Sequence, residues 1–180
     1  MTVFEMVFSL LVLVLGLSLV EVLSGLTRCL NARSEVHVGW LTPLLGIWVI
    51  GDVTTFWGIA WEVRDLLRSV WPSLGVGVAL TSVYYVAASM VFPRDVSAQP
   101  DLDAHFWQNR RTVVGLVMAC NVAVWVLALA NGARWPVEIA VLNGLYLTAG
   151  IAAMIARSWT GNTVTLCLLI AILAWNFASQ

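Results

Sequence analysis

Residues 43–68 read PLLGIWVIGDVTTFWGIAWEVRDLLR, a largely apolar stretch with Asp52 near its middle. As a helix rising about 1.5 Å per residue, this stretch is long enough to cross the roughly 30 Å hydrocarbon core of a bilayer. A carboxylate in the middle of such a span costs about 3 kcal/mol or more unless it is paired or protonated. We therefore expect Asp52 to face protein or water and not lipid.

The rest of the chain has the same apolar character. Of its 180 residues, 61% are hydrophobic and 11% are charged, which leaves too little polar surface for a water-soluble globule. Six stretches are long enough to span a membrane, namely residues 3–27, 43–68, 72–92, 104–131, 136–157 and 162–178. A polar loop, 93–103, separates the first three from the last three. We predict an all-α, polytopic integral membrane protein whose six transmembrane helices form one bundle and one domain.

Turn-forming and capping residues predict where several of these helices begin and end. Pro43, Pro72 and Pro136 are predicted to be first helical residues, because proline fits the start of a helix. Asp101 and Asp103 are natural N-caps for the fourth helix, predicted to begin at Ala104, and Gly132 is its predicted terminator.

The charge distribution bears on partners and orientation. A net charge of −1 provides no basic face for nucleic acid, so the lipid bilayer is the predicted partner surface. The first, third and fifth loops and the helix ends beside them hold six arginines: Arg28, Arg33, Arg94, Arg110, Arg111 and Arg157. The second and fourth hold three: Arg64, Arg68 and Arg134. The positive-inside rule then predicts a bacterial inner (cytoplasmic) membrane protein with both termini on the periplasmic side.

Cysteine and histidine give no sign of a metal centre or a disulfide framework. The three cysteines, Cys29, Cys120 and Cys167, show no CxxC or CxxH spacing. The only metal candidates are His37 and His105, each of which has carboxylates close by in the sequence. Neither belongs to an HxxxH or ExxH pattern, and helix caps and interfacial histidines account for the same residues. We therefore predict no metal site.

Two acidic residues in the first two spans allow two interpretations. If these helices are antiparallel neighbours, Glu21 and Asp52 both lie roughly 10–14 Å from the inner helix ends, and together they form a proton or cation site. Alternatively, Glu21 pairs with Arg28 along its own helix, while Asp52 hydrogen-bonds to Thr55 or to a neighbouring helix. The sequence leaves both open.

Buried amides and hydroxyls extend this candidate intramembrane polar site. Thr55, Asn121 and Asn143 are its predicted members beside Glu21 and Asp52, and they either line a polar pathway or hydrogen-bond between helices. Further hydroxyl groups in the spans belong to the same set: Thr81, Ser82, Tyr84, Tyr85 and Tyr146.

Three tryptophans lie deeper in the spans than an interfacial aromatic belt would place them. These are Trp48, Trp57 and Trp125, and they are candidates for contacts with a ligand or with lipid. Packing in the core is the alternative.

No GxSxG motif, no cysteine beside a histidine and no glycine-rich phosphate loop occurs, which favours a protein without catalytic activity. We interpret the chain as a non-catalytic integral-membrane subunit of a larger assembly, built with other membrane subunits or as a homo-oligomer. That assembly would be of an energy-transducing or a pigment- or lipid-binding kind. The alternative is a small transporter or channel that moves a proton, cation or small solute past Glu21 and Asp52. An intramembrane enzyme is a third, lesser alternative.

Overall fold

The computed structural model describes residues 3–32, 39–62, 70–96 and 101–178, and the structural statements that follow concern these residues. They form α1 (Val3–Asn31), α2 (Leu41–Glu62), α3 (Val70–Ser89), α4 (Leu102–Ala130), α5 (Val137–Ile155) and α6 (Trp159–Ala178). Each of the six helices is long and apolar enough to cross a membrane. The predicted all-α fold of six transmembrane helices is confirmed.

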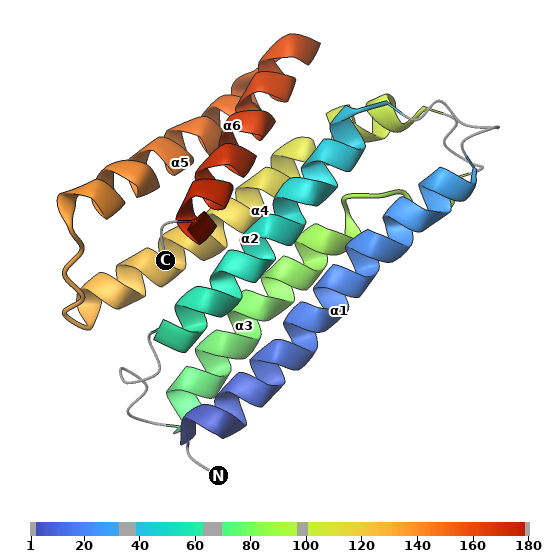
Figure 1. Ribbon diagram of the computed structural model, residues 1–180. Coiled ribbons are helices and arrows are strands. Elements are labelled where there is room, and N and C mark those ends of the chain that lie inside the picture. The colour runs from blue at the N-terminus through green and yellow to red at the C-terminus, as the bar shows by residue number, and fades with distance from the viewer. Residues whose placement is uncertain (1–2, 33–38, 63–69, 97–100, 179–180) are drawn as a thin grey trace.

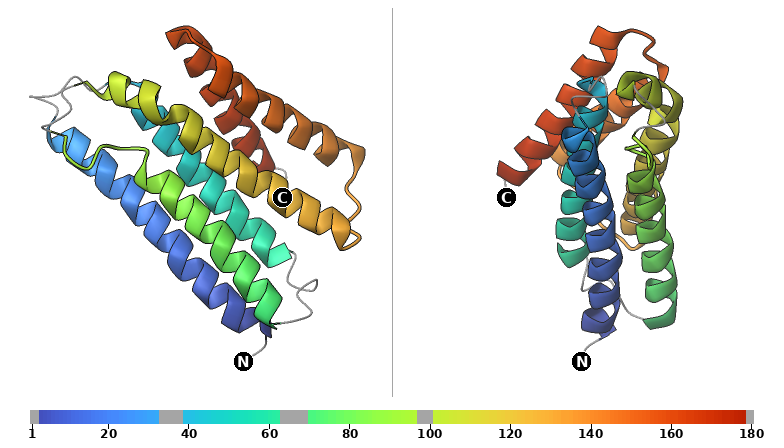
Figure 2. Two further views of the ribbon diagram at one scale, coloured as in Figure 1. Left: turned by 180° about the vertical axis from the view of Figure 1, so that it is seen from behind. Right: turned by 90° about the vertical axis from the view of Figure 1, so that its right-hand side faces the viewer.

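The helices do not pack in the order in which the chain makes them. The main partner of α1 is α3, and α3 also packs against α4. α2 contacts α1, α4 and α6, while α5 packs on α4 and α6. Figures 1 and 2 show α5 and α6 as a hairpin on the side of the bundle away from α1. α2 and α4 therefore lie in the middle of the bundle, which brings Asp52 and Asn121 inside it.

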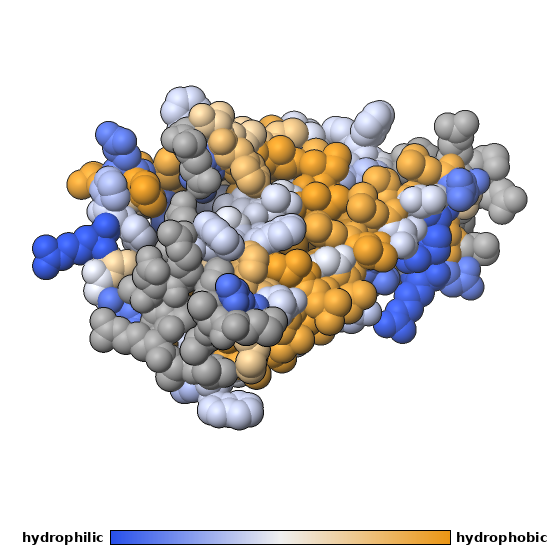
Figure 3. All heavy atoms as spheres, turned by 60° about the horizontal axis from the view of Figure 1, so that its bottom comes forward, coloured by the Kyte–Doolittle hydropathy of each residue, from blue (hydrophilic) through white to orange (hydrophobic). Residues whose placement is uncertain are grey.

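The outer surface of the bundle is apolar, as a lipid-facing surface must be. Exposed side chains on α1 include Leu13, Leu17 and Val20, and those on α4 include Val126 and Leu129. Figure 3 shows hydrophobic side chains over the middle of one face, with hydrophilic ones towards both of its ends. The chain is an integral membrane protein, and its helices are held together by packing and by hydrogen bonds between them.

The prolines lie near helix starts, but their predicted positions are wrong by one or two residues. α2 begins at Leu41, before Pro43, and α3 begins at Val70, before Pro72, while Pro136 directly precedes α5. The N–H groups of the first turn have no partner within the helix, so proline fits anywhere in that turn. Thr42 does not cap its own helix but donates a 2.8 Å hydrogen bond to the Leu102 carbonyl of α4.

Other boundaries also differ from the ranges read from the sequence. α1 continues to Asn31, four residues past the expected end at 27, and α3 stops at Ser89, three residues before 92. The part of the second predicted span at 63–68 lies outside the described residues. At α4 two of the three sequence signals are confirmed: the Asp101 carboxylate accepts from the Asp103 N–H at 3.0 Å, and Gly132 follows the helix end with a φ of +87°. Asp103 is not a cap but lies in the first turn, because α4 begins at Leu102, two residues before the expected start.

One glycine permits a close approach and leads to a first testable prediction. A Cβ at Gly25 of α1 would lie 2.6 Å from Cβ of the buried Phe92, which cannot swing away because that atom is fixed to the backbone. We expect Gly25→Ala to lower the free energy of unfolding in detergent by about 1–3 kcal/mol.

The matched control is Gly16→Ala on the same helix, where the added methyl group would meet nothing within 4 Å. Gly16→Ala should leave the free energy of unfolding unchanged or raise it by up to about 1 kcal/mol, because alanine favours a helix more than glycine does. Equal effects of the two substitutions would contradict the close contact.

Candidate functional site

Asp52 lies inside the bundle with only 2% of its surface exposed. The Tyr84 hydroxyl donates to its Oδ2 at 2.7 Å, and the Tyr146 hydroxyl donates to its Oδ1. The Asn121 amide nitrogen lies 3.2 Å from Oδ1 and 3.0 Å from Oδ2. Helices α2, α3, α4 and α5 therefore meet at one carboxyl group. The expectation that Asp52 points away from lipid is confirmed.

The direction of one of these hydrogen bonds is fixed by a fourth side chain. Trp48 is fully buried one turn before Asp52, and its Nε1–H lies 3.0 Å from the Tyr146 hydroxyl oxygen. An indole nitrogen only donates, so the Tyr146 oxygen accepts from Trp48. The hydroxyl hydrogen of Tyr146 is then directed to Oδ1 of Asp52. Trp48, Tyr146 and Asp52 thus form an ordered chain of donors that ends at the carboxylate.

The partners of Asp52 are held in place by their own helices. Asn121 also donates to the Val117 carbonyl at 3.1 Å, one turn earlier in α4, which fixes the amide beside the carboxylate. Tyr84 is fully buried, and its ring centroid lies 5.0 Å from that of Phe56. All three partners are neutral donors. Bonds from neutral donors to an ionised carboxylate are charge-assisted, and three of them offset much of the cost of burying it.

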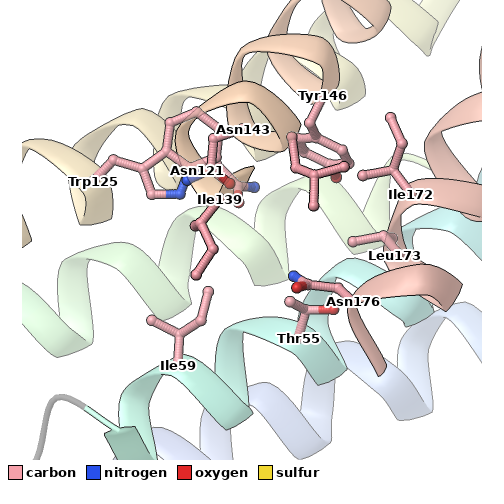
Figure 4. Close-up of a pocket in the computed structure, with 11 residues that line it drawn as sticks. Thr55, Ile59, Asn121, Trp125, Ile139, Asn143, Tyr146, Ile172, Leu173 and Asn176 are labelled. Atoms are coloured by element: carbon pink, nitrogen blue, oxygen red, sulfur yellow. The ribbon is translucent and has the colours of Figure 1, made fainter. Parts of the chain in front are cut away.

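A small cavity lined by both polar and apolar side chains begins where this cluster ends. It has a volume of about 40 Å³ and is lined by Thr55, Ile59, Asn121, Trp125, Ile139, Leu142, Asn143, Tyr146, Ile172, Leu173 and Asn176 (Figure 4). A water molecule needs roughly 10–15 Å³ of such space, so the cavity has room for a few waters. Pockets for organic ligands measure about 300–1,000 Å³, which is far larger.

The cavity lies between Asp52 and one end of the bundle. Its lining residues come after Asp52 in α2 and after Asn121 in α4, before Tyr146 in α5, and from the last two turns of α6. These positions all lead towards the bundle end where α2, α4 and α6 finish and α5 begins. The cavity therefore extends from the carboxylate cluster towards a single side of the membrane.

The structure brings together four of the five predicted site residues. Asp52 and Asn121 are in contact, while Asn121, Thr55 and Asn143 line the cavity. The Thr55 hydroxyl donates to the Gly51 carbonyl at 3.0 Å and not to Asp52. Glu21 is neither a partner of Asp52 nor a lining residue of the cavity.

Glu21 instead interacts with its own helix. Its carboxylate lies 3.7 Å from the Arg28 guanidinium, which is the second of the two arrangements predicted from the sequence. The predicted pair of Glu21 and Asp52 is not formed, because α1 packs mainly against α3 and Glu21 remains partly exposed beside Arg28.

The three deep tryptophans lie in different surroundings. Trp48 is in the core, Trp125 lines the cavity, and Trp57 is 40% exposed with its ring centroid 6.4 Å from that of Phe8. They do not form one aromatic wall. Trp57 faces outwards, where lipid would contact it.

Of the two histidine candidates, the structure describes His105. The His105 ring nitrogen Nε2 lies 3.1 Å from the Met90 carbonyl oxygen, and His37 falls outside the described residues. Across the part of the chain that the structure describes, no group of three or more His, Cys, Asp or Glu side chains is placed to hold a metal ion.

From the sequence, Tyr84 and Tyr146 belong to the set of hydroxyl residues in the spans but are not among the predicted site residues, and Asn176 is not predicted at all. Tyr146 lies three residues after Asn143, so the two share a helix face, and this spacing was an available signal. For Tyr84 no such signal existed, because its proximity to Asp52 depends on how α2 and α3 are rotated. Asn176 is a single amide near the end of α6, and nothing in its spacing linked it to the others.

These features define a class: a small polytopic membrane protein whose buried carboxyl group is bound by side chains from three other helices. No protein-family model, curated protein or solved structure matches the chain. Its function is therefore inferred from its own residues.

Proposed function

We propose that this chain is a non-catalytic subunit of a larger membrane protein assembly, and the partly exposed pair Glu21–Arg28 carries the proposal. The Glu21 side chain is 30% exposed and that of Arg28 is 39% exposed, within the apolar span Glu5–Asn31. Glu21 lies ten residues before Asn31 at the end of α1, or about 15 Å along the axis. Charges at such depth are stable when protein covers them and costly when lipid does.

The surface around Glu21 suits a further helix. Leu17 and Val20 are exposed beside it on α1 and continue the same surface towards Leu13. An apolar stripe interrupted by one ion pair gives a partner helix both packing area and a polar group to bind. The partner is either another membrane subunit or a second copy of this chain, and the aromatic Trp57 offers a separate contact for lipid.

We also propose a location in the inner membrane of a bacterium, with both termini on the periplasmic side. Six crossings return the chain to the side on which it began. The excess of arginines in the first, third and fifth loops supports the cytoplasmic assignment of those loops.

Native mass spectrometry of the protein extracted from its own membrane in mild detergent tests the subunit proposal. We expect a mass above the 19.7 kDa of one chain, and we expect the double variant Glu21→Gln, Arg28→Gln to reduce that mass to 19.7 kDa. The added mass tells a second copy from a different subunit.

Arg157→Gln is the matched control, because Arg157 is exposed between α5 and α6, away from the pair on α1. Recovery of the unaltered chain only as a monomer would refute the proposal. So would a double variant that keeps its full complement of partners.

The second candidate function is a small transporter or channel at Asp52, and the cavity beside the carboxylate cluster favours it. The cavity extends from the carboxylate cluster towards one side of the bundle, as half of a permeation path would. In this candidate function the transported species passes Asp52, Asn121 and Tyr146, and Glu21 takes no part. Flux through the purified chain in liposomes that disappears in Asp52→Asn would support this candidate over the first.

A further inference from the structure

The cavity reaches the partners of Asp52 but not Asp52 itself. Tyr146 and Asn121 are among its lining residues, whereas Asp52 and Tyr84 are not. Water in the cavity therefore meets Tyr146 before it can meet the carboxylate. Any exchange of protons between the cavity and Asp52 has to pass a side chain that touches both, and Tyr146 is the one of the two with a hydroxyl group.

We propose that Tyr146 relays protons between water in the cavity and Asp52, so that Asp52 takes up and releases a proton towards the bundle end where α2, α4 and α6 finish. The inference rests on the transport function proposed for Asp52, since it names the proton as the species bound.

The hydrogen bonds at Tyr146 allow this step with atoms and charge in balance. Its oxygen accepts from Trp48 Nε1–H, and its hydroxyl hydrogen points at Oδ1 of Asp52. A hydronium in the cavity donates one proton to the Tyr146 oxygen, and the original hydroxyl proton moves to Oδ1. The products are a water molecule, a neutral Asp52 and a Tyr146 whose hydroxyl now points into the cavity. Release follows the same steps in reverse.

Trp48 keeps the relay oriented throughout. Before transfer the Tyr146 oxygen accepts from Trp48 and from water, and it donates to Asp52. After transfer it accepts from Trp48 and from the protonated Oδ1, and it donates to water. Both states use one donor and two acceptor positions, which is the full capacity of a hydroxyl group. No polar atom of Tyr146 is left without a partner in either state.

The other ionisable groups around Asp52 do not offer a competing route. From α3 the Tyr84 hydroxyl meets Oδ2, and from α4 the Cys120 thiol points to the Leu80 carbonyl at 3.6 Å; neither lines the cavity. On α1 the acidic groups of the described span are Glu5, in its first turn, and Glu21, which pairs with Arg28; on α5 Glu138 is exposed in the first turn, and none of the three lines the cavity. On α6 the ionisable residue is Cys167, which is exposed on the outside of the bundle.

The size of the cavity and the state of the carboxylate favour a proton over a metal cation. Both carboxylate oxygens already accept hydrogen bonds, so a bound cation would have to displace the hydroxyl of Tyr84 or Tyr146. A proton needs no such displacement, because only the direction of existing hydrogen bonds changes. A cavity of about 40 Å³ suits a short water file and no larger solute.

Infrared difference spectroscopy after a pH jump tests the relay on the full chain in lipid nanodiscs. The carbonyl band of protonated Asp52 is identified by its absence in Asp52→Asn. We expect the band to form on acidification, and to form about 100-fold more slowly in Tyr146→Phe, as for loss of a positioned proton-transfer group. Tyr84→Phe is the comparison variant: it also removes one hydroxyl from Asp52, but Tyr84 does not line the cavity, so this variant should slow formation of the band clearly less than Tyr146→Phe does.

Three results would overturn the relay: no Asp52 carbonyl band at any pH at which the protein is folded, a Tyr146→Phe rate equal to that of the unaltered chain, or equal slowing in Tyr84→Phe. A second variant, Asn143→Leu, keeps Tyr146 and fills the cavity with an apolar side chain. It should slow the band as well, whereas Thr148→Val on the exposed face of α5 should not. Asn143→Leu with an unaltered rate would count against the relay even if Tyr146→Phe fails to fold.

Flux measured in parallel separates this inference from the transport function. Protonation of Asp52 that depends on Tyr146, without flux in liposomes, keeps the relay and refutes transport. Proton flux that depends on Asp52 but not on Tyr146 keeps transport and refutes the relay.

Discussion

Replacing Asp52 by alanine is expected to lower the free energy of unfolding of the bundle by about 3–6 kcal/mol, at about 1–2 kcal/mol for each of three donors left without an acceptor. The hydroxyl groups of Tyr84 and Tyr146 and the amide of Asn121 all donate to this one side chain. Asn121 and Tyr146 line a cavity of about 40 Å³, whereas Tyr84 is fully buried and does not line it. The measurement is a reversible denaturation series in mixed detergent micelles.

Two comparisons give this prediction its control. Asp52→Asn keeps the shape and one acceptor oxygen, and the Tyr84 hydroxyl can turn to accept from the new amide, so the loss should be smaller than with alanine. Ser82→Ala removes an exposed hydroxyl two residues before Tyr84 and should change the free energy of unfolding by less than about 0.5 kcal/mol. If Asp52→Ala were no more destabilising than Ser82→Ala, the carboxylate cluster would not hold the helices together.

Replacing Trp48 by alanine should cost a similar amount, about 3–5 kcal/mol, for a different reason. Trp48 is the largest of the fully buried side chains, and its removal leaves a cavity between α2 and its neighbours. It also removes the Nε1–H donor of Tyr146. Thermal unfolding in detergent and the denaturation series should both report the loss.

Trp48→Phe separates the two contributions, because it keeps most of the ring volume and removes only the donor. Its cost should be near the 0.6 kcal/mol average for hydrogen bonds between membrane helices, and below about 2 kcal/mol. Trp57→Ala is the control for size on the same helix, since Trp57 is 40% exposed and its loss leaves no closed cavity. Similar costs for Trp48→Ala and Trp57→Ala would show that the buried position is not what matters.

The fold could be predicted from the sequence because membrane insertion imposes strong rules on length and polarity. Six apolar stretches, a few capping residues and Gly132 were enough to predict the six helices, and to place the ends of α4 within two residues. The exact helix starts at Pro43 and Pro72 were not, because a proline fits any position of the first turn. The inward orientation of Asp52 followed from the cost of exposing a carboxylate to lipid.

The partners of Asp52 could not be predicted in the same way. Spacing along one helix identifies a face, but which helix covers that face depends on packing between helices distant in sequence. The assumption that α1 lies beside α2 at the level of Asp52 led to Glu21 as its partner. In the structure α3 is the main neighbour of α1, and Tyr84 and Tyr146 occupy the positions around the carboxylate.

The separation in sequence between Asp52 and Tyr146 has a consequence for biosynthesis. In a nascent chain that has inserted only α1 to α4, Asp52 can accept hydrogen bonds from Tyr84 and Asn121. Trp48 Nε1–H still lacks its acceptor, which is the Tyr146 hydroxyl on α5. The Asp52 carboxylate therefore lacks one of its three hydrogen-bond donors until α5 leaves the ribosome and enters the membrane. Insertion of α5 then completes the hydrogen bonds that fix the final helix arrangement. Chains truncated before α5 would be substrates for membrane quality-control proteases.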